Sequence, residues 1–156
     1  MSAAIISVSP AEYFRQRVAK VVKQQQAEID YEVEFYIVNM MCDFIQPVAA
    51  NSFDQPLALN LLEAMEATGS DQQAKYKALG DNSVYVAGFF QESLARRCTS
   101  VDYHAKMGSV AYHALSSLVC GREKSLYEKL AASVATMIDI MAEVGMAAGM
   151  HHSTDI

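Results

Sequence analysis

The sequence predicts an all-α protein, a single-domain bundle of six or seven helices. Apolar residues recur at spacings of three and four along most of the chain, and helix-capping residues separate these stretches. Alternation of apolar and polar residues, the pattern of a half-buried strand, does not extend beyond the first few residues. A length of 156 residues suits one domain, with residues 1–9 and 145–156 expected to be flexible ends.

The first helix is predicted from Pro10 to about Ala27. Ser9 and Glu12 form a capping box around a proline at the first helical position. The inward stripe consists of Phe14, Val18 and Val21. The outer face carries a basic patch of Arg15, Arg17, Lys20 and Lys23. This patch is either a solvated face or a docking surface for an acidic partner.

Two further helices follow. One begins after Asp30 and ends before Pro47, with an apolar stripe of Val33, Tyr36, Ile37, Met40, Met41 and Phe44. The other begins at Pro56 and ends near Ala67, with a stripe of Leu59, Leu62 and Met65. Gly69 and Ser70 then lead into a short helix from Asp71 to Leu79, which Gly80 is expected to close.

Asp81 is the expected N-cap of a helix from Asn82 to about Arg97. Thr99 or Ser100 begins the next helix, which is expected to reach Val119 and stop at Gly121. The last helix is predicted from Glu123 to about Val144. Its apolar seam consists of Tyr127, Leu130, Val134, Met137, Met141 and Val144. A helix that is apolar on most sides is either central or shared between subunits, and we expect the seam to form a homodimer interface.

Residues 79–118 contain the candidate ligand site. The expected pocket lies between the helices at 82–97 and 101–119, and its candidate residues are Tyr85, Phe89, Glu92, Arg96, Tyr103, His104, Met107 and Tyr112. Each also has a purely structural interpretation. Glu92 and Arg96 have the spacing of an intrahelical ion pair, and His104 fits a hydrogen-bonded, partly buried histidine. Gly88 and Gly108 suit close helix packing.

The sequence contains no catalytic or metal-binding motif, so we expect no catalytic residues, no metal ligands and no cofactor. Glu-x-x-His and His-x-x-x-His, the usual helical metal pairs, do not occur. His104 and His113 are nine residues apart, which places them on opposite sides of a helix. The three cysteines are isolated and are expected to be small buried residues. A metal or haem protein is the least favoured alternative.

The charge of −6 and pI near 5.1 argue against nucleic acid as a partner. No apolar run reaches the 18 or so residues of a membrane span, and the first residues lack the features of a secretory signal. The sequence thus predicts a cytoplasmic protein.

Several short segments resemble a group of small, uncharacterised all-helical bacterial proteins. The resemblance lies in Leu79–Gly80–Asp81, Gly88–Phe89–Phe90, Val101–Asp102–Tyr103, Met107–Gly108 and Ala111–Tyr112. It implies a bacterial helical domain and carries no activity or site residue with it.

Two functions are therefore expected from the sequence. The leading one is a non-enzymatic regulatory or protein-interaction module that forms a homodimer through the last helix. The alternative is a helical bundle that binds a small apolar or anionic ligand between the helices at 82–97 and 101–119.

Overall fold

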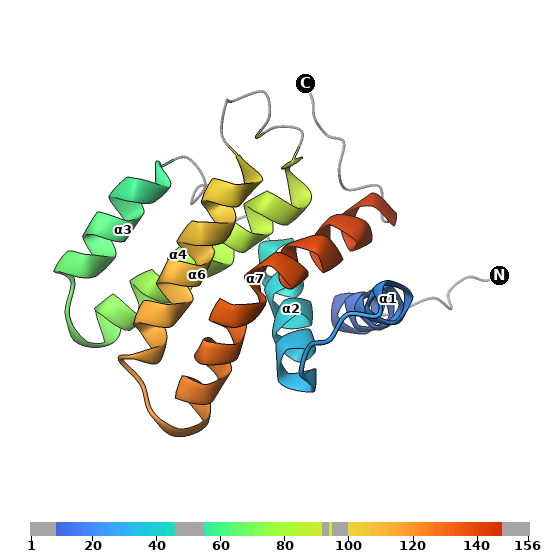
Figure 1. The fold of residues 1–156 in the computed structure, drawn as a ribbon, viewed down its shortest axis with the longest axis horizontal. Helices are drawn as coiled ribbons and strands as arrows, with labels where there is room; N and C mark the ends of the chain where they lie inside the picture. Colours follow the sequence, from blue (N-terminus) through green and yellow to red (C-terminus); the bar gives the residue numbers. More distant parts are fainter. Residues whose placement is uncertain (1–8, 46–54, 92–93, 95–99, 148–156) are drawn as a thin grey trace.

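The computed structural model describes residues 9–45, 55–91, 94 and 100–147. Within these residues the chain is helical, and the predicted all-α fold is confirmed (Figure 1). The helices are α1 (Pro10–Gln25), α2 (Tyr31–Phe44), α3 (Leu57–Glu66), α4 (Gly69–Phe89), α6 (Val101–Ser116) and α7 (Gly121–Ala147).

One continuous hydrophobic core joins these helices, and α7 lies at its centre. Helices α4 and α6 pack side by side, and α7 crosses both of them. On its other side α7 contacts α1 and α2, which also contact each other. Helix α3 packs on α4 at one side of the molecule, while α1 lies at the opposite side (Figure 1).

The starts of α1 and α6 follow predicted capping residues. The Ser9 hydroxyl accepts the backbone N–H of Glu12 at 3.1 Å, and the Ser100 hydroxyl accepts that of Tyr103 at 2.9 Å. Ser100, rather than Thr99, is therefore the cap of α6. At the other end of α1, Gln26 terminates the helix in the left-handed conformation at φ 54°. The ends differ from prediction by a few residues, since α6 stops at Ser116 and α7 already begins at Gly121.

The predicted break at Gly80 and Asp81 is wrong. Helix α4 continues through both residues and is 21 residues long, so the helix expected at 71–79 and the first part of the one expected at 82–97 form one helix that ends at Phe89. The reason is tertiary. A Cβ on Gly80 would lie 2.6 Å from the Tyr112 ring, so this glycine makes room for an aromatic side chain of α6. Asp81 is buried and binds side chains from other helices instead of capping its own.

The apolar seam on α7 lies inside the single chain. All six of its residues are buried, and four of them are fully covered. Neighbouring helices cover α7 on several sides, so its wide apolar surface is explained by its central position. Of the two interpretations that the sequence allowed for such a helix, the structure shows the central one, and the seam no longer argues for a dimer.

Candidate functional site

The structure describes six of the eight candidate ligand residues, and it places five in the core and one on the surface. Five of them are buried in the core: Tyr85, Phe89, His104, Met107 and Tyr112. Tyr103 lies on the outer side of α6 and is 41% exposed. Glu92 and Arg96 lie outside the described residues. The pocket between these helices stays a prediction.

Tyr85 and Phe89 belong to an aromatic cluster between α2 and α4. Their rings lie 4.6 Å apart, as expected for residues one turn apart on the same helix. On another side, Phe44 at the end of α2 stacks on Tyr85 with ring centroids 4.3 Å apart. Burial raises the pKa of Tyr85 to about 12, so its hydroxyl remains protonated at neutral pH. The aromatic face predicted to hold a ligand thus packs against a third helix.

His104 is buried near the start of α6. Its Nδ1 lies 3.2 Å from the Ser100 carbonyl oxygen, which assigns the proton to Nδ1 because a carbonyl only accepts. Burial lowers the pKa of His104 despite this backbone hydrogen bond, and the ring is therefore neutral at pH 7. The neutral ring thus donates a hydrogen bond to the carbonyl oxygen of Ser100, the N-cap residue of its own helix.

A buried polar network around Asp81 was not predicted from the sequence. Asp81 Oδ1 accepts hydrogen bonds from the hydroxyls of Tyr36 and Tyr112, each at 2.7 Å. Its second oxygen accepts from Lys77 Nζ at 2.9 Å. The network joins α2, α4 and α6, and Tyr127 of α7 stacks beside Tyr112 at 6.4 Å. Three helices therefore meet at this carboxylate, and α7 packs beside it.

The electrostatics of the network favour a structural role over proton transfer. Burial and then the negative charge of Asp81 raise the pKa of both Tyr36 and Tyr112 far above the ordinary range, so both remain hydrogen-bond donors. Burial alone would lower the pKa of Lys77, but the charge and hydrogen bond of Asp81 outweigh it and raise that pKa. The positive ammonium also lies 5.4 Å from the Tyr36 ring centroid. Each of these donors therefore has Asp81 as its acceptor, and the Lys77 ammonium is paired with the Asp81 carboxylate.

The sequence contains one indication of this network, although the Gly80–Asp81 pair predicts a break between two helices instead. Asp81 follows Lys77 by four residues, the spacing of a helical ion pair, and this spacing itself argues for a continuous helix. The Gly–Asp pair is equally typical of a helix stop and a new start. Only the tyrosines, 45 and 31 residues away in the chain, distinguish the two cases.

The most distinctive surface is on α3, and here a prediction is wrong. The expected inward stripe of Leu59, Leu62 and Met65 is exposed at 43%, 48% and 58%. Ala64 faces the core instead, flanked by the half-buried Leu57 and Leu61. Helix α3 is apolar on two sides, so periodicity alone did not indicate which side packs on α4. We call the exposed side, with Glu63 and Glu66, the α3 face.

The outer side of α1 carries the predicted basic patch, but one of its four residues is paired with a carboxylate. Arg15 is held by Glu12, with Nη2 and Oε2 2.5 Å apart. Within the described part of the chain, Arg17, Lys20 and Lys23 have no carboxylate within 4 Å. The Arg17 guanidinium lies 5.3 Å from the ring centroid of Tyr13, which is 36% exposed. We call these four residues, Tyr13, Arg17, Lys20 and Lys23, the α1 face.

The remaining observations concern metal ligands, membrane spans and cysteines within the described residues. No group of three or more His, Cys, Asp or Glu side chains there has the arrangement of a metal site. No helix in this part has both the length and the apolar character that a bilayer span requires. Cys42 is partly buried and Cys120 is exposed, so Cys120 is not the buried residue that was predicted; Cys98 lies outside the described residues.

Comparisons with known proteins identify no relative. No protein-family model, curated protein or solved structure matches the chain.

Proposed function

We propose that this protein is a non-enzymatic interaction module that associates with further copies of itself through the α3 face. The observation that carries the proposal is the row of Leu59, Leu62 and Met65, exposed together on a helix at the side of the molecule. Large apolar side chains gathered on one exposed helix side are typical of protein contact surfaces. The sequence-based expectation that the chain associates with itself thus moves from α7 to α3.

The buried chemistry supports the non-enzymatic part of the proposal. Asp81, the most buried carboxylate described, has its oxygens occupied by two tyrosines and a lysine. The His104 ring is engaged with its own helix. General acid or base catalysis needs a group that can reach a substrate, and each of these groups is instead hydrogen-bonded within the protein.

The size of the α3 face indicates a weak contact. Full burial of a leucine or methionine side chain contributes roughly 1.5–3 kcal/mol, and these three are already about half covered. Their remaining burial would contribute about 2–4 kcal/mol, which is less than the cost of association, estimated at about 4–15 kcal/mol. Stable contact therefore needs a complementary surface on the other copy. The three apolar residues form only the centre of the interface.

The test is sedimentation velocity of the purified chain from about 10 μM to about 1 mM, the concentration range of weak protein association. We expect the weight-average sedimentation coefficient to rise with concentration, and Leu62→Glu to remove the rise. The matched control is Val110→Glu, because Val110 on α6 is 49% exposed, close to the 48% of Leu62. Circular dichroism should show both variants folded. A wild-type chain that stays monomeric, or two variants that behave alike, would contradict the proposal.

A further inference from the structure

We infer that the copies associate head to tail, with the α3 face of one copy against the α1 face of the next. This inference rests on the proposed function and names its partner surface. It comes from the distribution of charge over two faces that lie far apart on one molecule.

The α3 face is acidic as well as apolar. Helix α3 contains Glu63 and Glu66 and no lysine or arginine. Two α3 faces pressed together in a two-fold contact would bring four carboxylates into one small interface. Like charges across an interface oppose binding by several kcal/mol, so an α3-to-α3 dimer is disfavoured.

The α1 face has the opposite charge. Helix α1 holds four basic residues and one acidic residue, a net charge of 4 − 1 = +3 in a chain whose total is −6. Lys20 and Lys23 are exposed, so their ammonium groups are available to Glu63 and Glu66 of another copy. The Tyr13 ring and the aliphatic stems of the lysines offer apolar surface to Leu59 and Leu62.

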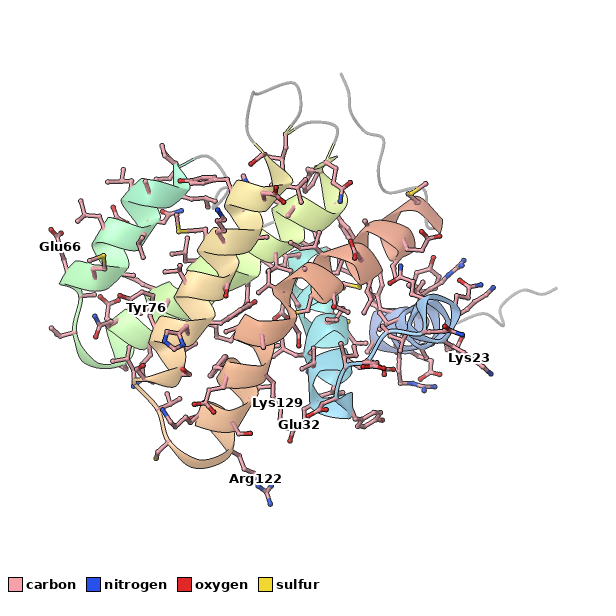
Figure 2. The ribbon with its side chains drawn as sticks, viewed as in Figure 1. Lys23, Glu32, Glu66, Tyr76, Arg122 and Lys129 are labelled. Atoms are coloured by element: carbon pink, nitrogen blue, oxygen red, sulfur yellow. The ribbon has the colours of Figure 1, made fainter. Side chains whose placement is uncertain are left out.

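The positions of the two faces decide the geometry of assembly. Glu66 on α3 and Lys23 on α1 lie at opposite sides of the molecule (Figure 2). A two-fold dimer would need both faces on one side of the molecule, so that the α3 face of each copy contacts the α1 face of the other. Faces on opposite sides instead leave one free at each end, which produces a closed ring or an open filament.

The experiment uses two variants of the full chain, each with one face blocked. Leu62→Glu blocks the α3 face, and Lys20→Glu with Lys23→Glu blocks the α1 face. We expect each variant alone to be monomeric, or at least tenfold weaker in association, and an equimolar mixture to form a dimer that grows no further. The free α1 face of the first variant then meets the free α3 face of the second.

The control for charge is Lys106→Glu with Arg122→Glu, because both residues are exposed and the net charge changes equally. This variant should associate like the wild type. If the variant blocked on α1 associates normally and the mixture shows no dimer of the two variants, head-to-tail assembly is refuted while self-association through α3 stands. If neither the wild type nor any mixture associates, both proposals fail.

Discussion

The replacement Asp81→Ala tests whether the buried network holds the fold together. It removes the acceptor of two tyrosine hydroxyls, and Tyr112 is fully buried while Tyr36 is largely so. A hydrogen bond to a charged group contributes about 1.5–3 kcal/mol, so the two together contribute about 3–6 kcal/mol. The half-exposed Lys77 adds about 0–1 kcal/mol. Alanine returns at most about 0.7 kcal/mol of helix propensity. We expect a net loss of about 2–7 kcal/mol in the free energy of unfolding.

Urea denaturation followed by circular dichroism measures this loss. The control is Asp71→Ala, which removes an aspartate of the same helix whose bond to Lys75 is exposed at 3.3 Å. That change should cost less than about 1 kcal/mol. A loss for Asp81→Ala no larger than that of the control would refute the structural role of the network.

The tyrosines provide a second and stricter test of the same reasoning. In a background of Tyr36→Phe with Tyr112→Phe, no buried hydroxyl remains to lose its partner. Most of the cost of Asp81→Ala should then disappear, since removing both partners of a hydrogen bond is far less costly than removing one. Additive losses in the triple variant would show that Asp81 stabilises the protein by some other means.

Two further predictions concern helix packing and pH. A Cβ on Gly88 would lie 2.8 Å from the Met141 Cβ, whereas the nearest atom to one on Gly108 is the Val84 Cγ2 at 3.1 Å. Gly88→Ala should therefore lower the free energy of unfolding by at least about 1 kcal/mol more than Gly108→Ala, and equal effects in urea titrations would contradict a tight α4–α7 crossing. For His104 the folded pKa is below the ordinary 6.5, so the unfolded chain binds protons more readily and stability decreases as pH falls below about 6.5. His104→Gln should flatten that part of a pH series of urea titrations, and an unchanged slope between about pH 7.5 and 5.5 would count against burial of a neutral ring.

Prediction succeeded where a few neighbouring residues decide the outcome. The capping of α1 by Ser9 and of α6 by Ser100 depends on atoms within three residues of each cap. The apolar stripe of α7 was read correctly because its period is a local property of the sequence. The candidate site was predicted less well. Tyr85 and Phe89 do meet, but the ring of Phe44 that covers Tyr85 comes from a helix about 40 residues earlier.

The sequence by itself determined the helical class, the caps of α1 and α6 and the uneven charge, because helical period, these caps and charge are properties of short segments. The tertiary structure alone decided that α4 runs through Gly80 and Asp81, that α7 is central, and which side of α3 is exposed. Each of these depends on a neighbour from a distant part of the chain. The Tyr112 ring packs against Gly80, so this glycine serves helix packing and does not end a helix. Ala64 packs toward the core, and Leu62 therefore faces the solvent.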